Sequence, residues 1–343
     1  MHRKNRSQAQ SSMTTSRRRA LWQLGGLAAG ALAVPGLVRG QSQSQPAPGF
    51  PGKPITLILP FPPGGSFDPI LRALAQAASQ DLGQPVVLMH KPGGGGVTGT
   101  ASLTSGVDAD GYTIAVMHNS VIRQPLLMKT SWDPLKDFSY LIGLASLSTA
   151  VAVAADAPWR TLPELLADAK ARPGLISWGN VGAISVNRIY AERLARSAGV
   201  RFNMIPFKGG AEAFQALLGR HLDVYGDPGF GAMATSGKVR LLASFTEQRL
   251  KRWPQVPTVR ELGHDLVIDS PIGLVAPRGI EPAVASRLHA AFSKASGDAE
   301  YRRLLEEFDM QPNPMTGEAY RNYAAAQQAR EKTLLAESGF KAE

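Results

Sequence analysis

The regular alternation of two kinds of segment most constrains how this chain folds. Beyond residue 52, short apolar segments of strand length alternate with longer segments whose apolar residues recur at helical spacing. The predicted strands span residues 55–60, 86–89, 112–117, 151–154, 176–178, 203–206, 222–225, 239–244 and 273–277. The predicted helices span residues 69–82, 98–105, 162–171, 185–198, 211–218, 282–296, 299–308 and 317–339. This order indicates an α/β fold with mainly parallel sheets and ligand sites at the carboxyl ends of the strands.

The length of 343 residues and the apolar content of 44% are sufficient for two such domains. The formal net charge of +10 suggests nucleic acid or an anionic membrane as a partner. Residues 1–40, however, hold seven Lys and Arg and no acid, and the remaining chain has 30 Lys and Arg against 27 Asp and Glu. Because the excess charge lies mainly at the N-terminus, we expect no nucleic-acid partner.

The N-terminal 40 residues have the order of an export signal. A basic block with Arg17 and Arg18 precedes a mildly apolar stretch over residues 21–38, which ends near small residues. The paired arginines resemble a twin-arginine signal, so residues 1–40 are predicted to be cleaved and the mature protein to be periplasmic. The alternative is a membrane anchor, which the glycines and the proline of the stretch disfavour. Residues 41–52 are then a disordered lead-in.

Several kinds of chemistry are disfavoured by the sequence. There is no cysteine, which excludes disulfides, thiolate zinc sites and a cysteine nucleophile. The six histidines show no paired spacing, so no metal is expected. Residues 94–99 match the pattern G-x-G-x-x-G, but a Lys-Pro pair separates them from the preceding strand and no acid ends the next strand. No cofactor is therefore expected.

Three glycine-rich loops lead into predicted helices. They are Gly64-Gly65-Ser66 with Asp68 as the expected N-cap, residues 179–185, and Lys208-Gly209-Gly210. Free backbone N–H groups at a helix start attract carboxylate or phosphate, and the helix dipole adds to this attraction. Each loop alone is ordinary for an α/β fold. Together, in an exported chain without catalytic motifs, they favour a solute receptor.

The same residues carry a family resemblance. Residues 55–72, ITLILPFPPGGSFDPILR, resemble the opening of the periplasmic receptors of tripartite tricarboxylate transporters, often called the Bug family. The segments LGQPVVLMHKPGGGGVTGT, IPFKGGAEAFQALLGRHLDV and GLVAPRGIEPAVASRLHAAF extend the similarity along the mature chain. The resemblance implies two α/β domains joined by two crossover strands, as in type II periplasmic binding proteins, with the ligand between them. Domain 1 then spans residues 53–149 plus 272–343, and domain 2 spans residues 150–271.

The resemblance also implies which residues bind the ligand, because the family holds a carboxylate through main-chain groups of two facing loops. On domain 1 the matching residues are Phe61, Gly64, Gly65, Ser66 and Asp68. On domain 2 they are Gly179, Gly182, Ala183, Ile184 and Ser185. The rest of the site is expected to include His118, Asn119, Ser120, Lys208, Gly209 and Asp227.

Several residues depart from the family pattern, among them Pro271-Ile272, which stand where the family has an aromatic residue. Phe67 and Ile184 bring apolar bulk to positions where the family has small or polar residues. Arg188 stands where the family has histidine; it either adds positive charge to the pocket or lies on a solvated helix face. These departures concern the identity of the ligand.

The sequence predicts a periplasmic solute-binding protein for a small carboxylate or related organic solute. It would act as a monomer without a cofactor and deliver the solute to a tripartite tricarboxylate-type transporter or to a sensor kinase. The alternative is an exported α/β enzyme acting on a small organic acid, for which Asp68 and Asp227 are the candidate catalytic residues. A third interpretation is a cytoplasmic anion-binding module tethered to the membrane by its N-terminus.

Overall fold

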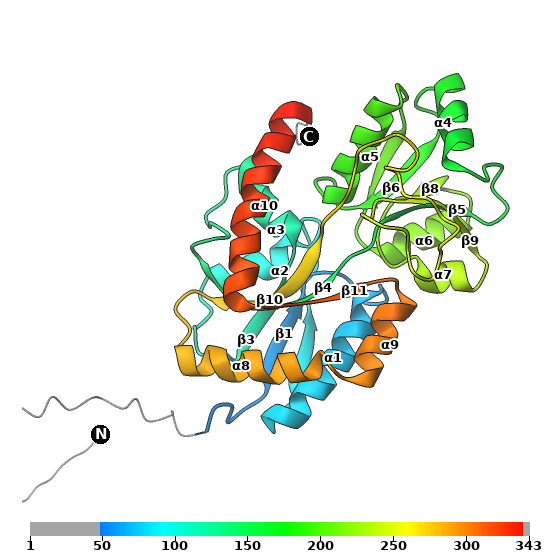
Figure 1. Cartoon of the computed structure of the whole chain (residues 1–343). Helices are drawn as coiled ribbons and strands as arrows, with labels where there is room; N and C mark the ends of the chain where they lie inside the picture. The colour runs from blue at the N-terminus through cyan, green and yellow to red at the C-terminus, as the bar shows by residue number, and fades with distance from the viewer. Residues whose placement is uncertain (1–48, 339–343) are drawn as a thin grey trace, which may run out of the picture. The chain divides into compact units, whose positions relative to one another are not determined.

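Two β-sheets form the framework of residues 49–338, the part of the chain that the computed structural model describes (Figure 1). The six-stranded sheet has the order β11-β4-β10-β3-β1-β2 and the five-stranded sheet the order β7-β6-β8-β5-β9. We call the parts built on these sheets the first lobe and the second lobe. The strands of the first lobe are β1 (Ile55–Leu59), β2 (Val86–His90), β3 (Thr113–Met117), β4 (Phe138–Ser146), β10 (Pro271–Pro277) and β11 (Gln311–Thr316). Those of the second are β5 (Ala150–Ala154), β6 (Ser177–Val181), β7 (Asn203–Phe207), β8 (Val224–Tyr225) and β9 (Val239–Ser244).

Helices cover both faces of each sheet, because side chains of successive strand residues point to opposite faces. In β1, Ile55, Leu57 and Leu59 pack on one side, while Ile58 packs on the other. The helices of the first lobe are α1 (Phe67–Leu82), α2 (Val97–Ala101), α3 (Asn119–Leu127), α8 (Pro282–Ala295), α9 (Ala299–Glu307) and α10 (Gly317–Ser338), with a 3-10 turn at Ser102–Thr104. Those of the second are α4 (Leu162–Ala171), α5 (Val186–Ser197), α6 (Gly210–Leu218) and α7 (Gly231–Thr235).

The predicted α/β fold is confirmed, but the sheets are mixed rather than mainly parallel. Strand β1 is parallel to β2 and β3, and β6 is parallel to β7 and β8. Strand β10 is antiparallel to β3 and β4, and β5 is antiparallel to β8 and β9. The physical reason is that β5 and β10 each enter their sheet directly from the other lobe, without a crossover helix that would reverse the chain.

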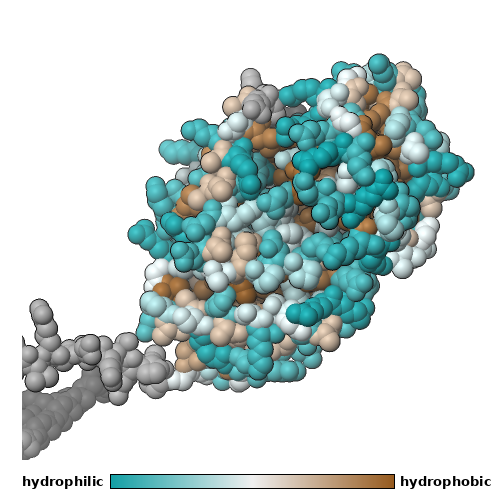
Figure 2. Space-filling model, viewed as in Figure 1, coloured by the Kyte–Doolittle hydropathy of each residue, from teal (hydrophilic) through white to brown (hydrophobic). Residues whose placement is uncertain are grey.

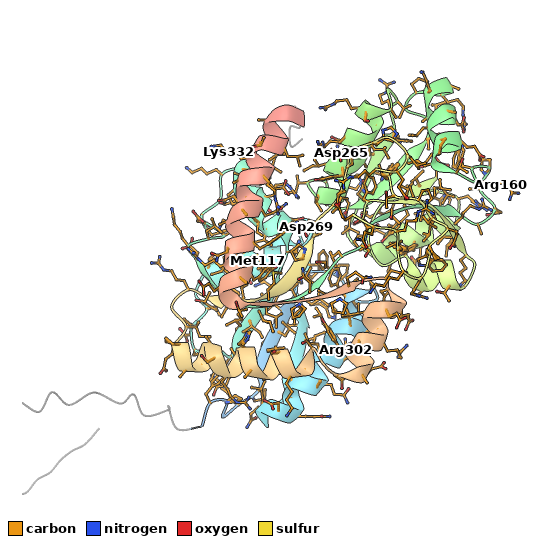
Figure 3. All side chains as sticks on the ribbon, viewed as in Figure 1. Met117, Arg160, Asp265, Asp269, Arg302 and Lys332 are labelled. Atoms are coloured by element: carbon orange, nitrogen blue, oxygen red, sulfur yellow. The ribbon has the colours of Figure 1, made fainter. Side chains whose placement is uncertain are left out.

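The chain passes between the lobes at residues 147–149 and again at residues 269–270, after residues 245–268 have packed against the second lobe. These two segments lie side by side: the Leu147 N–H donates to the Ser270 carbonyl at 2.9 Å. The first crossing leads directly into β5, and the second leads directly into β10. Figure 3 labels Asp269 on the second crossing, where its carbonyl accepts from the Tyr323 hydroxyl of α10 at 3.2 Å.

The predicted export signal over residues 1–40, and residues 41–48 of the lead-in, lie outside the described residues. Within residues 49–338, no helix has the length and apolar character needed to span a membrane. On the face shown in Figure 2, hydrophilic side chains predominate and apolar residues appear in scattered patches. The large exposed apolar residues are Val87, Met89, Met128, Leu175 and Leu218.

Candidate ligand-binding site

Residues of both lobes and of both crossing segments line a cavity of about 340 Å³. The first lobe contributes Phe61, Pro62, Pro63, Gly65, Ser66, Phe67, Gly95, His118, Asn119 and Ser120. The second contributes Val181, Ser185, Val186, Asn187, Lys208, Gly209, Gly210, Ala211, Glu212, Gln215, Tyr225, Asp227 and Pro228, and the crossings contribute Leu147 and Ser270. This volume lies at the lower end of the range of ligand pockets, roughly 300–1,000 Å³.

The first residues of four helices lie in the wall of this cavity. They are Ser66 and Phe67 of α1, Asn119 and Ser120 of α3, Ser185 to Asn187 of α5, and Gly209 to Ala211 of α6. The first N–H groups of a helix have no partner within the helix, and the helix dipole places partial positive charge there. Two of these helices belong to each lobe, so a single anion between the lobes is able to contact backbone donors on both sides.

A hydrogen-bonded carboxylate lies at the second-lobe side of the cavity. Asp227 is 4% exposed; its Oδ2 accepts from the Val181 N–H at 2.6 Å, and its Oδ1 accepts from the Asn187 side-chain amide. The amide oxygen of Asn187 in turn accepts from the Thr149 hydroxyl at 2.9 Å. Burial raises the pKa of Asp227 to about 7, although the donors from Val181, Asn187 and Asn180 oppose the rise.

An aromatic group forms the first-lobe side of the cavity. The rings of Phe61 and Phe67 are stacked with centroids 5.1 Å apart and planes inclined by 15°. His118 lies 5.3 Å from the Phe61 ring, and its Nε2 donates to the Gly96 carbonyl at 2.9 Å. Burial lowers the pKa of His118 to about 4, so the imidazole is neutral near pH 7. A Cβ on Gly96 would lie 2.6 Å from the Phe61 ring, which explains the glycine at this position.

Ten of the sixteen residues predicted for the site line the cavity. They are Phe61, Gly65, Ser66, His118, Asn119, Ser120, Ser185, Lys208, Gly209 and Asp227. His118 and its two neighbours lie at the start of a helix that was not predicted, since α3 begins at Asn119. Lys208 is exposed, and its backbone N–H donates to Glu212 Oε2 at 3.1 Å. Apart from Lys208, Glu212 and Asp227, the lining residues have no carboxylate, ammonium or guanidinium group.

Six predicted residues do not line the cavity: Gly64, Asp68, Gly179, Gly182, Ala183 and Ile184. Gly179 lies in β6, where a Cβ would lie 2.5 Å from Leu222, so its role is packing. A Cβ on Gly182 would lie 2.8 Å from the Cα of Gly95, so this glycine allows the two lobes to touch. The carbonyl of Ile184 accepts from Arg123 at 3.0 Å, so this residue contacts the first lobe.

Asp68 was predicted as an N-cap, which is wrong, and as a ligand contact, although it does not line the cavity. The N-cap of α1 is Ser66, whose side chain makes no capping hydrogen bond. Asp68 Oδ1 lies 3.0 Å from Arg72 Nε and 3.2 Å from His90 Nε2. His90 Nδ1 lies 3.0 Å from the carbonyl oxygen of Phe61. Asp68 therefore acts behind the cavity wall, where it helps to hold the backbone that carries Phe61.

Arg188 also lies outside the cavity lining, and its Nε donates to Glu192 Oε1 at 2.9 Å along α5. Residues that the sequence reasoning missed include Asn187, Leu147 and Ser270. Asn187 stands two residues after the predicted Ser185, in the first turn of the same helix, so its spacing was a usable signal. Leu147 and Ser270 lie in the crossing segments, and no local pattern marks them as cavity residues.

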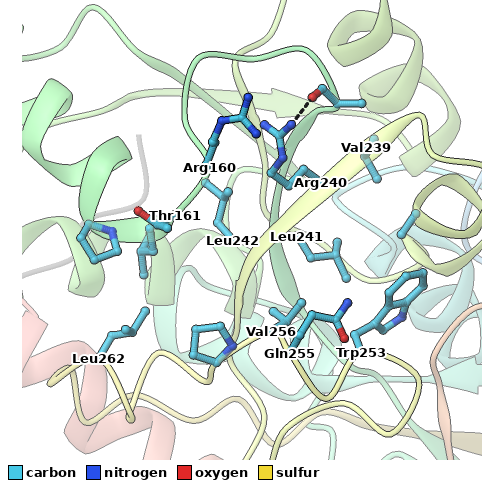
Figure 4. Close-up of a pocket in the computed structure, with 15 residues that line it drawn as sticks. Arg160, Thr161, Val239, Arg240, Leu241, Leu242, Trp253, Gln255, Val256 and Leu262 are labelled. Carbon is cyan, nitrogen blue, oxygen red and sulfur yellow. Dashed lines mark hydrogen bonds between the residues drawn. The ribbon is translucent and has the colours of Figure 1, made fainter.

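A groove of about 600 Å³ lies on the second lobe alone, beside β9 (Figure 4). Its cationic residues include Arg160 and Arg240. The guanidinium of Arg240 donates to the carbonyls of Ala155, Ala157 and Trp159, so its donors are already used by the backbone. This groove is larger, but it is lined by the start of one helix, Thr161 to Pro163 of α4, whereas four helix starts from both lobes line the cavity between the lobes. We assign the ligand site to that cavity.

Comparisons with known proteins show the family of this chain. Residues 70–340 match the family model described as tripartite tricarboxylate transporter family receptor. A protein of Cupriavidus necator, described as "UPF0065 protein in gbd 5'region", is 42% identical over 312 residues, which cover 91% of this chain and 95% of that protein.

Two solved structures share the fold over most of the chain. The periplasmic binding protein BugD is 26% identical with a TM-score of 0.81, covering 85% of this chain and 99% of its own. MatC from Rhodopseudomonas palustris with bound malate is 25% identical with a TM-score of 0.77, covering 83% of this chain and 100% of its own. This chain is similar to both.

Proposed function

The chain belongs to the tripartite tricarboxylate transporter receptor family, and from this premise we propose that it binds a small carboxylate in the cavity between its lobes and presents it to a membrane transporter. The malate held by MatC shows that a relative of this fold takes such a ligand. In this chain, the carboxylate would lie among the backbone donors of α1, α3, α5 and α6. The protein thus acts by binding, without a chemical step.

One observation carries this proposal: helix starts of both lobes line the same cavity. A helix N-terminus stabilises an anion by about 0.3–1 kcal/mol at an exposed site and by up to about 2 kcal/mol when partly buried. An anion that contacts donors of both lobes gains more than one that contacts either lobe alone. Ligand binding therefore stabilises the arrangement in which the lobes are together, and that arrangement is what a transporter would recognise.

We expect the receptor to work in the periplasm. The support is the order of residues 1–40 together with the periplasmic description of BugD. If the signal is of the twin-arginine kind, replacing Arg17 and Arg18 together by lysine traps the precursor in the cytoplasm, as a cell-fractionation blot would show. Normal processing of this variant would contradict that export route.

The partners follow from the same family. We expect the membrane subunits of a tripartite transporter to receive the ligand, with a sensor kinase as an alternative receiver. A single chain supplies both lobes and completes the cavity, so the receptor is expected to act as a monomer. Size-exclusion chromatography with light scattering, with and without ligand, tests this expectation.

The proposed function is tested by a thermal-shift screen of small carboxylic acids on the purified protein, with native mass spectrometry to identify any solute retained from the cell. A ligand at 100 times its Kd stabilises the protein by about 2.7 kcal/mol, which is a shift of several degrees. Stabilisation by at least one carboxylic acid is expected. Stabilisation only by uncharged solutes would contradict the proposal.

A further inference from the structure

We propose that the preferred ligand is an aromatic monocarboxylate, held with its ring against Phe67 and its carboxylate at the helix starts, rather than a compact dicarboxylate. This inference rests on the proposed function and narrows its ligand class. It is carried by the shape and chemistry of the cavity wall, which is aromatic on one side, polar on the other, and contains no buried cation.

The first step is the aromatic pair. Phe61 and Phe67 both line the cavity, are nearly parallel, and are each only partly buried. Both rings also pack against the core of the first lobe, so they are supported from behind. The exposed part of these rings is available to the cavity, because both residues line it. Aromatic rings with centroids about 4.5–7 Å apart gain a favourable interaction energy in addition to the energy of burying apolar area. An aromatic ring on the ligand would therefore bind well to this surface.

The second step is that these rings are held in place before a ligand arrives. His118 and Gly96 confine the Phe61 ring from one side, and the His90 contact to the Phe61 carbonyl fixes its backbone. Phe67 is the first residue of α1, so its backbone position is set by the helix. A platform that is already ordered costs less conformational entropy on binding than one that must be ordered.

The third step is the rest of the apolar lining. Pro62, Pro63 and Leu147 add apolar surface, and Tyr225 adds an aromatic ring that is stacked on Phe214 at a centroid distance of 4.0 Å. The hydroxyl of Tyr225 donates to the Pro228 carbonyl at 2.6 Å, so it is not free to donate to a ligand. A small, highly polar solute would leave this surface without a partner.

The fourth step is charge. The charged residues that line the cavity are Lys208, Glu212 and Asp227. Lys208 and Glu212 are exposed, and Asp227 is buried and acidic. The buried lining therefore contains no lysine or arginine to pair with a second carboxylate. A second carboxylate would have to share the backbone donors or reach the exposed Lys208. Without either partner it would be buried unpaired, which is strongly unfavourable.

The test measures the Kd of benzoate, benzamide and malate by calorimetry on the purified protein. We expect benzoate to bind at least about tenfold more tightly than malate, because only benzoate covers the aromatic wall without burying a second charge. The variant Phe67→Leu should weaken benzoate roughly 3- to 10-fold, since it keeps apolar volume but loses the ring face. Phe67→Tyr, which keeps the ring face, should restore most of the affinity.

Phe308→Leu is the matched control, because Phe308 is a partly buried ring packed on the same core but away from the cavity. It should leave the benzoate Kd unchanged, and circular dichroism of each variant checks that it is folded. Tighter binding of malate than of benzoate, no binding of benzoate, or equal affinity in Phe67→Leu would overturn the inference. Binding of malate alone would leave the proposed function intact. Equal binding of benzoate and benzamide would instead contradict the carboxylate function while supporting the aromatic platform.

Discussion

Two buried titratable side chains in the cavity wall respond to pH in opposite ways. The pKa of His118 is lowered from 6.5 to about 4, and the pKa of Asp227 is raised from 3.8 to about 7, both mainly by burial. Between pH 4 and 6.5 the unfolded chain binds more protons at His118 than the folded chain, so this residue makes stability rise with pH. Asp227 makes stability fall with rising pH between pH 4 and 7, because the folded chain binds more protons at this residue than the unfolded chain does.

The contributions of His118 and Asp227 to the pH dependence of stability oppose each other over nearly the same pH range. A separate variant of each residue should therefore reveal its own contribution. Relative to the parent, Asp227→Asn should become progressively more stable from pH 4 to 7, by up to about 4 kcal/mol. His118→Asn should become progressively less stable relative to the parent from pH 4 to 6.5, by up to about 3 kcal/mol. Urea unfolding at several pH values measures both differences. A constant offset between variant and parent at every pH would contradict this account.

At the scale of elements, a buried ion pair joins two helices of the first lobe and reaches the second. The side chain of Arg123 in α3 is 0% exposed and that of Glu331 in α10 is 1% exposed. Arg123 Nε donates to Glu331 Oε2 at 2.7 Å, and Gln327 Nε2 donates to Glu331 Oε1 at 2.9 Å. Arg123 also donates to the carbonyl of Ile184 in the second lobe. The pair therefore fixes the position of α3, whose first residues line the cavity.

Removing one partner of this pair should be costly. Glu331→Gln leaves a buried guanidinium without its counter-charge and should lower the free energy of unfolding by about 3–5 kcal/mol. The double variant Arg123→Met, Glu331→Leu removes both charges and should be closer in stability to the parent than the single variant is. Denaturant unfolding compares the three proteins. A single variant as stable as the parent would show that the pair is not essential.

The same elements show what the sequence could predict. Helices with strong apolar periodicity, such as α4 at Leu162–Ala171, were predicted with the observed bounds. Strand β11 was missed because its segment QPNPMT contains two prolines and pairs along one side only, at the edge of the sheet. Strand β4 was also missed. The pairing of Arg123 with Glu331 joins residues 208 positions apart, and no local pattern indicates such a contact.

For the site, the loop motifs predicted ten of the lining residues, but their spacing alone did not show which side of each loop faces inward. Gly182 and Ile184 contact the other lobe, whereas Val181 and Ser185 on either side of them line the cavity. Phe67 was noted as apolar bulk, yet its stacking on Phe61 depends on the turn between β1 and α1. Tertiary contacts of this kind decide the details of a binding site, whereas local patterns indicate its location.

At the scale of the whole molecule, the two lobes touch at points that leave no room for an added side-chain atom. A Cβ on Gly209 in the second lobe would lie 2.7 Å from the Pro62 ring in the first lobe. On another face of the interface, the Trp253 indole N–H donates to Asp309 Oδ2 at 2.8 Å. The cavity is therefore bounded by contacts that need the lobes to be together, and we expect ligand binding to favour that state.

Gly209→Ala should hold the lobes apart or force Pro62 to shift, because the added methyl group would lie too close to the Pro62 ring. The substitution adds no backbone strain, since any residue can adopt the φ of −165° found at this position. We expect ligand affinity to fall by roughly tenfold or more, at 1.4 kcal/mol per tenfold. Gly52→Ala is the control, since Gly52 lies outside the cavity lining and a Cβ there would be at an ordinary contact distance of 3.6 Å from the Gly49 carbonyl oxygen. Equal affinity in the two variants would argue against a site that depends on contact between the lobes.

The central claim is that backbone donors of both lobes bind a carboxylate. Calorimetry on the purified protein, comparing the acid found by the thermal-shift screen with its neutral amide, tests it most directly. The amide loses the interaction with the helix termini and leaves buried donors unpaired, so its affinity should be lower by roughly 30- to 1,000-fold. Equal affinity for the acid and the amide would contradict the account.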